Sequence, residues 1–498
     1  MAQFITLNPG ALAELRTIDP CLVSYNIEMT EITGGTFWKS YTPEQRAGTE
    51  DFPHLQKLAD DPTSMAELMQ YYPPIDLYSE KLRGLAKELG TAWVRISGSW
   101  ATTTYYDFDG HTGGRPPEGY RAVLSKAQWI GVLDFVRAIG AKLLISLANC
   151  AGLHAHDEPW NPSQAEQIFA LSKEYGVPID AAEFMNEPNM LEMSGAPKGY
   201  TGADFARDQD LFFAWVRKHY PGVLCVGPCS AGAGDNKDSG GIASLLPDCP
   251  IDELMAGTIE PLDVYSYHCY NGISERLASM LPAMHWPADQ AHTDAYLAVA
   301  GATAMLHLPY RDRYCPGGQM WVTEAGDAGG GGDTWASTYL DVLRTLNEFG
   351  SFAKLTDGIV FHNTLASSDY GYLAHGTFTP RPSYFAALLW NRLMGTTVYD
   401  AAEPTREGAH VFAHSRRDGK EGIAYLVINN SMSDATTVQL PGTAEVYCLT
   451  ASFPRAETMQ CNGVELVLGE GNALPAIEPV RSEGTLELPP MSCTFVLV

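Results

Sequence analysis

Residues 181–189 read AAEFMNEPN, a short apolar run that ends in the polar sequence Asn-Glu-Pro-Asn. Seven more apolar, β-prone runs recur between residues 20 and 365. They lie at residues 22–27, 92–97, 143–148, 223–227, 263–268, 320–324 and 358–362. Several are almost continuously hydrophobic, which is typical of strands that are buried on both faces of a parallel sheet.

Stretches with helical spacing separate these runs. Residues 79–90 and 126–140 carry apolar side chains three and four positions apart, and each stretch ends in Gly, a common helix stop. Residues 201–220 and 335–350 have similar spacing. Eight strands that alternate with helices predict a closed α/β barrel, the (β/α)8 or TIM barrel, over residues 15–385.

The sequence changes in character after about residue 385. Short strand-like runs follow, separated by Gly, Pro, Asn and Asp, and they read AHVFAHSRR, GIAYLVINN, ATTVQL, AEVYCL, GVELVL, GTLELP and CTFVLV. This pattern predicts an antiparallel β-sandwich domain over residues 386–498. The opening FITL run has no vacant place in an eight-stranded barrel, so residues 1–14 are expected to add a strand to the sandwich.

Composition limits the partners. The 498 residues carry a net charge of −27, which argues against nucleic acid and anionic membranes as partners. No apolar run approaches the roughly 18 residues that a membrane span needs. The N-terminus lacks a basic region followed by an apolar run, so a cytoplasmic location is expected. The ten scattered cysteines are accordingly expected to be buried free thiols.

Two carboxylates follow strands at the end where a TIM barrel keeps its chemistry, the carboxyl ends of the strands. Glu187 lies just past the fourth run, and Glu324 ends the seventh. Strands four and seven face each other across a barrel mouth, so the two side chains can approach a bound sugar from opposite sides. Glycoside hydrolysis needs an acid that protonates the leaving oxygen and a carboxylate that attacks the anomeric carbon or activates water. A Glu that ends a buried strand needs a partner or a function, which weakens a purely structural interpretation.

Asn-Glu-Pro after the fourth strand, with a Glu ending the seventh, resembles the pattern of retaining glycosidases of clan A. Longer segments in one order, covering the chain from about residue 20 to 498, resemble the heparanase and β-glucuronidase family, glycoside hydrolase family 79. These segments are residues 82–107, 159–189, 267–278, 321–332, 367–398, 462–475 and 484–498. The agreement of several motifs in one order is far more specific than any one of them.

The resemblance implies roles for the residues that match the catalytic motifs. Glu187 would be the general acid/base and Glu324 the nucleophile of a retaining mechanism with a covalent glycosyl-enzyme intermediate. Asn186 would donate its amide to the 2-hydroxyl of the reacting sugar. Tyr270 or His268 would hold the carboxylate of the nucleophile.

The resemblance also implies a sugar pocket. Glu28 and Ser99 would bind the outer hydroxyls of the sugar. Gly330 and Gly331 would bind the glucuronate carboxylate through their backbone N–H groups, because a loop free of side chains lets donors approach an anion closely. Tyr370 would add its hydroxyl to the same carboxylate.

Two charged residues bear on this pocket. Asp327 lies close to the glycine run, where its charge would repel a substrate carboxylate unless it points away or is paired. Arg95 is a charge within the second strand and is expected to pair with an active-site carboxylate such as Glu324.

These features together predict an exo-acting β-glucuronidase that acts on small glucuronides or oligosaccharides, with neither a metal nor another cofactor. One alternative is an endo-acting, heparanase- or hyaluronidase-like enzyme. A sulfated substrate would call for a cleft lined with Lys and Arg, and this acidic chain has few basic clusters. The other alternative is a non-catalytic carbohydrate-binding protein, against which the presence of both Glu187 and Glu324 counts.

Overall fold

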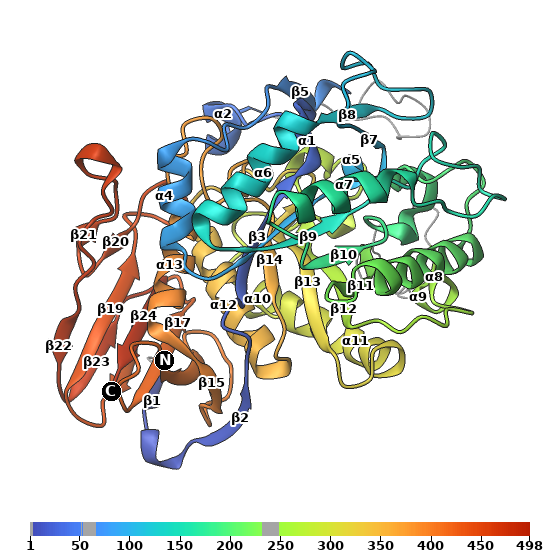
Figure 1. The fold of residues 1–498 in the computed structure, drawn as a ribbon. Helices are drawn as coiled ribbons and strands as arrows, with labels where there is room; N and C mark the ends of the chain where they lie inside the picture. Colours follow the sequence, from blue (N-terminus) through green and yellow to red (C-terminus); the bar gives the residue numbers. More distant parts are fainter. Residues whose placement is uncertain (1–2, 51, 53–65, 232–248) are drawn as a thin grey trace.

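The structure is a computed structural model that describes residues 3–50, 52, 66–231 and 249–498. Figure 1 shows a barrel of strands ringed by helices, with a second β-rich unit, drawn in orange and red, against one side. The two N-terminal strands, drawn in dark blue, pair with strands of this second unit. The predicted fold class, a TIM barrel with an antiparallel β domain after it, is confirmed.

The described barrel strands are β3 (Val23–Glu28), β6 (Trp93–Ser97), β9 (Lys142–Ser146), β10 (Ala181–Glu183), β11 (Leu224–Ala231), β12 (Val264–Ile273), β13 (Gln319–Gly329) and β14 (Val360–His362). Each pairs in parallel with the next one in the chain, and β14 pairs with β3 to close the barrel. Each of these strands overlaps one of the eight apolar runs in the sequence. The fourth and seventh predicted strands are therefore β10 and β13.

The helices that cover the barrel are α4 (Glu80–Glu88), α6 (Lys126–Ile139), α7 (Ser163–Glu174), α8 (Gly202–His219), α9 (Ile251–Leu254), α11 (Val299–Tyr314), α12 (Leu340–Leu355) and α13 (Pro382–Leu393). Local sequence explains where α6 begins and ends. Ser125 and Gln128 form a capping box at its start, and Gly140 closes it with a left-handed φ of 70°.

Shorter elements lie in the loops of the barrel. They are α1 (Met29–Thr33), β4 (Gly35–Trp38), α2 (Pro43–Ala47), β5 (Met69–Tyr72), α5 (Ser99–Thr102), β7 (Thr104–Asp107), β8 (Ala122–Ser125) and α10 (Asp294–Leu297). Strands β4 and β5 form an antiparallel pair, and β7 pairs with β8 in parallel. Strand β4 and helix α5 follow the carboxyl ends of β3 and β6, so both belong to the catalytic face of the barrel.

The inside of the barrel changes from apolar to polar along the strands. Trp93, Leu144 and Trp321 belong to an apolar cluster inside the barrel. Arg95 lies two residues after Trp93 on β6, and Glu183 lies two residues after Ala181 on β10. Both residues are charged and fully buried. Because side chains alternate along a strand, these charges point inward as well. The apolar layer thus carries a polar layer beneath the carboxyl ends of the strands.

The second unit is a sandwich of two sheets. The larger sheet contains β2 (Ala13–Thr17), β15 (Met394–Asp400), β16 (His410–Arg416), β17 (Ile423–Asn429), β24 (Ser492–Leu497), β19 (Ala444–Thr450), β20 (Gln460–Cys461), β21 (Val464–Glu465) and β22 (Val480–Ser482). The smaller sheet contains β1 (Gln3–Thr6), β18 (Thr436–Gln439) and β23 (Thr485–Leu488). The opening strand joins the sandwich as predicted, in parallel with β18.

The barrel in the structure begins and ends at residues other than those predicted, which were 15 and 385. Strand β2 pairs with β15 and so belongs to the sandwich up to Thr17, although the barrel was predicted to begin at residue 15. Helix α13 runs through residue 385, the predicted end of the barrel, and packs against α12. Sequence texture could not place these edges, because a strand in either unit has the same local pattern.

Strand β17 shows how one sheet serves two cores. Leu426 and Ile428 face the core that contains the barrel helices, whereas Tyr425 and Val427 face the core between the two sheets. This alternation follows from the two-residue repeat of a strand. Both faces of the sheet are therefore buried, and the sandwich is packed tightly against α12 and α13.

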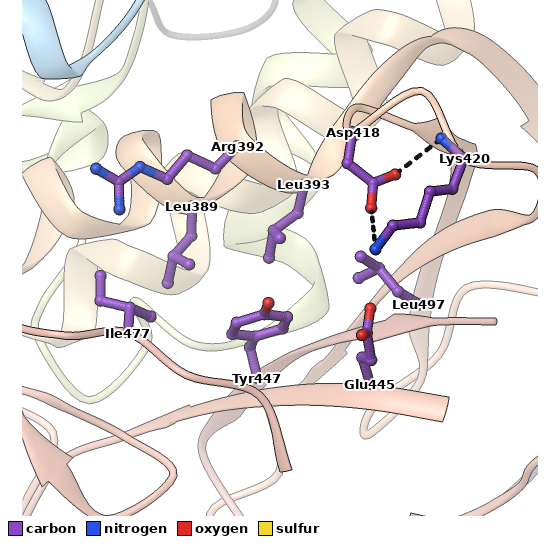
Figure 2. Close-up of a pocket in the computed structure, with 9 residues that line it drawn as sticks. All are labelled: Leu389, Arg392, Leu393, Asp418, Lys420, Glu445, Tyr447, Ile477 and Leu497. Carbon is purple, nitrogen blue, oxygen red and sulfur yellow. Dashed lines mark hydrogen bonds and ion pairs between the residues drawn. The ribbon is translucent and has the colours of Figure 1, made fainter. Parts of the chain in front are cut away.

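A hollow of about 270 Å³ lies at this junction, between α13 and the larger sheet (Figure 2). It is lined by Leu389, Arg392, Leu393, Asp418, Lys420, Glu445, Tyr447, Ile477 and Leu497. Its charged groups pair with neighbours: Arg392 with Glu88, and Lys420 with Asp418. Because α13 runs antiparallel to the strands, its last turn lies at the end of the barrel opposite the carboxyl ends of the strands.

All ten cysteines are free, and nine of them are buried, which confirms the prediction of buried thiols. Within the described ranges, no helix is long and apolar enough to cross a membrane.

At the junction between the units, replacing a helix glycine by alanine is expected to destabilise the protein. A Cβ on Gly350 of α12 would lie 2.4 Å from Cγ of Phe412 in β16, closer than packed atoms allow. Gly350→Ala should therefore lower the free energy of unfolding by about 1–3 kcal/mol, although Ala favours a helix by about 1 kcal/mol. Scanning calorimetry of the variant and the parent measures the change.

Gly84 of α4 is the matched control, because a Cβ there would meet no atom within 4 Å. Gly84→Ala should raise the melting temperature. Equal responses of the two variants would contradict the packing that the structure gives to Gly350.

Candidate active site

The two predicted catalytic carboxylates meet at the carboxyl ends of the strands. Glu187 follows β10 and begins the short 3-10 segment η2 (Pro188–Ser194), with a left-handed φ of 46°. Glu324 lies within β13, which continues to Gly329 beyond the predicted strand end. A carboxylate oxygen of Glu187 lies within 4.8 Å of one of Glu324. The side chain of Glu324 is 7% exposed and that of Glu187 is 22% exposed.

Arg95 is the cation on which this site is built. Its Nε donates to Oε2 of Glu183 at 3.0 Å, and its Nη1 donates to Oε1 of Glu324 at 3.0 Å. Its Nη2 donates to Oδ1 of Asn186 at 2.8 Å. The guanidinium is fully buried, so its charge must be compensated by these acceptors. The expected pairing of Arg95 with Glu324 is present.

The sequence left open whether Tyr270 or His268 holds the carboxylate of Glu324, and the structure gives the two residues different partners. The hydroxyl of Tyr270 donates to Oε2 of Glu324 at 2.8 Å, so Tyr270 holds the carboxylate. Nδ1 of His268 lies 3.0 Å from Oε1 of Glu187 and 3.6 Å from Oε2 of Glu324. His268 therefore bridges the two carboxylates, with Glu187 as its nearer partner.

These contacts set the ionisation of the site. Burial alone would raise the pKa of Glu324, but the charges of His268 and Arg95 and the Tyr270 hydroxyl lower it below its usual value. Burial would lower the pKa of His268, yet Glu324 and the other charged neighbours raise it well above its usual value. Glu324 is thus an anion and His268 a cation near neutral pH.

Glu187, His268 and Glu324 each offer an atom that could ligate a metal ion, and these atoms lie within 4.8 Å of one another. The charge of the site argues against such an ion. The guanidinium of Arg95 already lies 3.0 Å from Glu324 as a counter-charge to that carboxylate. A further cation at Glu324 would be repelled by the guanidinium.

Asn186 is held by its oxygen. Oδ1 accepts from Arg95 at 2.8 Å and from the hydroxyl of Ser97 at 3.2 Å. The side chain is buried, and two donors on Oδ1 leave the amide NH2 group facing elsewhere. This orientation leaves the amide group available as the donor that the resemblance implies.

Glu28 and Ser99 lie beside each other on the rim. Glu28 ends β3, and a Cβ on Gly98 would fall 1.6 Å from its Oε2, which explains the glycine before Ser99. Burial, then the charges of Glu324 and Glu31, raises the pKa of Glu28 well above its usual value. A neutral Glu28 can donate a hydrogen bond as well as accept one. Ser99 begins α5 and is half-buried.

Tyr370 lies next to Tyr270, the residue that holds Glu324. Nδ2 of Asn363 donates to the hydroxyls of both Tyr270 and Tyr370, at 2.8 and 3.1 Å. The two tyrosine rings are roughly parallel, with centroids 6.3 Å apart. The Tyr370 hydroxyl is therefore tied through Asn363 to the hydroxyl that holds Glu324.

Gly330 and Gly331 follow β13 with φ of 90° and 92°, a conformation that glycine adopts most readily. A Cβ would collide with Leu277 at Gly330 and with Trp38 at Gly331. Packing thus explains the two glycines in part. The neighbouring Gly329 lies against the ring of Tyr270, which brings the glycine loop to the edge of the site.

Asp327 is buried near the end of β13 and hydrogen bonded to the loop that follows this strand. It is 1% exposed, its Oδ2 accepts from the N–H of Asp333 at 2.8 Å, and its other charged neighbours are Asp341 and Arg344 of α12. Burial, with the charge of Asp341, raises its pKa well above the usual value. A raised pKa favours the neutral form of Asp327, which weakens the repulsion of a substrate carboxylate that the sequence suggested.

Sequence reasoning missed three residues of the site. Glu183 and Cys229 both contact Arg95, and Asn363 joins the two tyrosines. Glu183 could have been found, because it lies two residues from Ala181 on a strand whose inward positions alternate. Cys229 and Asn363 carried no such signal, since Cys229 lies beyond the predicted end of its strand and an Asn after a strand is common in any loop.

Curated proteins of known name resemble the chain. Heparanase-like protein 1 of Arabidopsis thaliana is 24% identical over 479 residues, which covers 85% of this chain and 85% of that protein. Baicalin-β-D-glucuronidase of Scutellaria baicalensis is 31% identical over 186 residues, 35% of each chain. A solved 4-O-α-L-rhamnosyl-β-D-glucuronidase from Fusarium oxysporum has a TM-score of 0.63 at 13% identity and covers 99% of this chain and 100% of that one. No protein-family model matches the chain.

The TIM barrel with one glutamate after its fourth strand and one on its seventh, followed by a β domain, is the arrangement of a glycoside hydrolase of clan A, in agreement with the sequence relatives. The sequence relatives narrow this class. They include heparanase-like proteins, a heparanase and a β-glucuronidase, so the chain is similar over most of its length to the heparanase and β-glucuronidase family, glycoside hydrolase family 79.

The Arg95 network predicts a pH-dependent loss of stability. Arg95→Met leaves Glu183 and Glu324 buried without their partner and should cost about 3–5 kcal/mol at pH 8. Without the guanidinium, the pKa of Glu324 in the folded state rises above its unfolded value, so the cost is present at high pH. It should shrink as the pH falls through that raised pKa, because the carboxyl then becomes neutral.

Urea unfolding at pH 8 and pH 5 measures this difference. Arg392→Met is the control, because Arg392 pairs with Glu88 where the side chains are 39% and 52% exposed. It should cost about 0–1 kcal/mol. The interpretation fails if Arg95→Met costs no more than the control at pH 8.

Proposed function

We propose that the chain is a retaining, exo-acting β-glucuronidase. The observation that carries the proposal is the approach of the Glu187 and Glu324 carboxylates to within 4.8 Å at the carboxyl ends of β10 and β13. Carboxyl groups about 5–5.5 Å apart suit a direct attack on the anomeric carbon, whereas an inverting enzyme needs a gap of about 6.5–9.5 Å for water. The short separation therefore supports a double displacement.

The two environments support different tasks for the two carboxylates. Glu324 is buried and anionic, and Arg95 and Tyr270 fix both of its oxygens, which suits the nucleophile. Glu187 is the more exposed and hydrogen bonds to His268, which suits a group that gives a proton to the leaving oxygen and later takes one from water. The first step would form an ester between Glu324 and the anomeric carbon, and water would then hydrolyse it.

The proposed preference for glucuronate rests on Tyr370 and the glycine loop after β13. The Tyr370 ring lies beside Tyr270, and Gly329 at the start of the glycine loop lies against the Tyr270 ring. The names of the Scutellaria and Fusarium proteins describe β-glucuronidases, which favours the same sugar here. A carboxylate would fit this donor-rich edge better than a neutral hydroxymethyl group.

Two further points follow from the same proposal. A net charge of −27 suits small glucuronides better than a sulfated polymer, so exo action is favoured over endo action. Ten free thiols suit a reducing compartment, which favours a cytoplasmic location. A non-catalytic binding protein would not need two carboxylates held within 4.8 Å of each other in opposite environments.

Substitution of the two glutamates tests the reaction. Glu324→Ala should abolish hydrolysis of every glucuronide. Glu187→Gln should slow substrates with poor leaving groups by about 10²–10⁴-fold and activated aryl glucuronides much less, because only the former need protonation. Steady-state kinetics on a series of aryl glucuronides measures the difference.

Proton NMR of the first product formed by the parent enzyme gives the stereochemistry. Release of the β-anomer agrees with retention, and release of the α-anomer would reject the double displacement. Equal losses across the leaving groups in Glu187→Gln would reject the acid/base role.

A panel of aryl glycosides tests the sugar. The parent should cleave p-nitrophenyl β-glucuronide far better than the glucoside or the xyloside. Tyr370→Phe removes one hydrogen bond to a charged group and should lower this preference by about 10–100-fold. Tyr372→Phe is the control, because its buried hydroxyl lies on a ring stacked against His362. A parent that prefers the glucoside or the xyloside rules out the glucuronate pocket.

A further inference from the structure

We propose that Cys229 is a positioning residue for the acid/base: its sulfur accepts the Nε2 proton of His268, which directs the Nδ1 proton of the same ring to Glu187 and Glu324. The kinetic consequence of this arrangement rests on the proposed function. The arrangement of protons itself can be tested without any substrate.

Cys229 lies at a distorted point of the barrel wall. It belongs to β11, where the pairing with β12 shifts register between Pro228 and Ser230, and its φ is 62°. The side chain is fully buried. Its sulfur lies 3.1 Å from Nε2 of His268 and 3.2 Å from Nη2 of Arg95. The distortion turns the sulfur toward the two cations of the site.

The two hydrogens on Nη2 of Arg95 determine which of its neighbours accept a hydrogen bond from it. Nη2 carries two hydrogens, and it lies 2.8 Å from Oδ1 of Asn186, 3.2 Å from the sulfur of Cys229 and 3.3 Å from Nε2 of His268. Asn186 takes one hydrogen. The sulfur takes the other, because 3.2 Å is short for a bond to sulfur and 3.3 Å is long for a bond to nitrogen. Nε2 of His268 therefore receives no proton from Arg95 and can carry its own.

On the opposite side of the His268 ring, the partners of Nδ1 among the described residues are both acceptors. Nδ1 lies 3.0 Å from Oε1 of Glu187 and 3.6 Å from Oε2 of Glu324. The charged or titratable groups that face the ring are thus Glu187 after β10, Cys229 on β11, Glu324 on β13 and Arg95 on β6. Three of these four can accept a proton, and the charges of Glu324 and Cys229 raise the pKa of the ring against its burial.

The backbone of Cys229 holds the acid/base as well. Its carbonyl oxygen accepts from the N–H of Glu187 at 3.1 Å. Glu187 and Cys229 both have left-handed φ values, a conformation that costs free energy for residues other than glycine. One residue therefore fixes the main chain of Glu187 through its carbonyl and the side chain of Glu187 through His268.

Nitrogen-15 NMR of histidine-labelled enzyme tests the proton positions directly, with His268→Gln to assign the signals. In the parent, both ring nitrogens of His268 should carry protons at pH 7. In Cys229→Ala and Cys229→Ser, one nitrogen should have lost its proton, because Ala offers no acceptor and the Ser hydroxyl, on a shorter bond, does not reach Nε2 as the sulfur does. Cys229→Asp should restore both protons.

Kinetics with p-nitrophenyl β-glucuronide tests the consequence. Loss of the positive charge beside Glu187 makes its proton harder to remove, so the alkaline limb of kcat/KM should move up by about one pH unit in the Ala and Ser variants. Cys229→Asp should keep the limb of the parent. Cys225→Ala is the matched control, because Cys225 is a buried thiol of the same strand that belongs to the core outside the barrel.

The outcomes separate the two proposals. A parent ring with a single proton at pH 7 overturns the role of Cys229, and so do Ala and Ser variants that keep the ring protonation and the pH profile of the parent. The parent spectrum decides the matter even if these variants fail to fold. If the parent cleaves no glucuronide, the proposed function fails, while the spectra still decide whether the sulfur holds His268.

Discussion

The guanidinium of Arg95 is the group on which the rest of the site depends. A fully buried charge in the middle of a barrel is costly unless every donor finds an acceptor. Arg95 on β6 meets this demand by reaching Glu183 on β10, Cys229 on β11 and Glu324 on β13. One side chain thereby ties four strands together just beneath the catalytic face. The fixed fork of an Arg, with five donors in one plane, makes this possible where a Lys could not.

The charge of Arg95 also gives Glu187 and Glu324 different environments, although both are glutamates near the ends of barrel strands. Glu324 shares Arg95 and Tyr270 and stays anionic although it is buried. Glu187 has no contact with Arg95 among its described partners; it reaches His268 and lies nearer the solvent. Pairs of titratable groups in opposite environments are the usual means by which one site supplies both a nucleophile and an acid. The anion of Glu324 also helps to keep Glu28 neutral, so a third carboxyl near the pocket can donate a hydrogen bond.

The periodicity of the sequence was enough to find the barrel, because strands buried on both faces are apolar at almost every position. It also placed Glu187 and Glu324 on one rim, since all parallel strands of a barrel end on the same side. It could not choose between Tyr270 and His268, which lie two residues apart on one strand, because that choice depends on distances across the barrel. It could not find Cys229 either, since the role of this residue comes from a register shift in β11.

The sequence by itself determined the order of the strands, the sandwich that follows them and the identity of the two carboxylates, because each of these is written in local patterns of apolar and polar residues. Tertiary structure alone decided how the charges are shared. The ionisation of Glu324, the raised pKa of Asp327 and the sulfur contact of His268 all arise between residues that are far apart in the chain. Electrostatic interactions depend on distance in space and on exclusion of water, and neither quantity can be read from neighbours along the sequence.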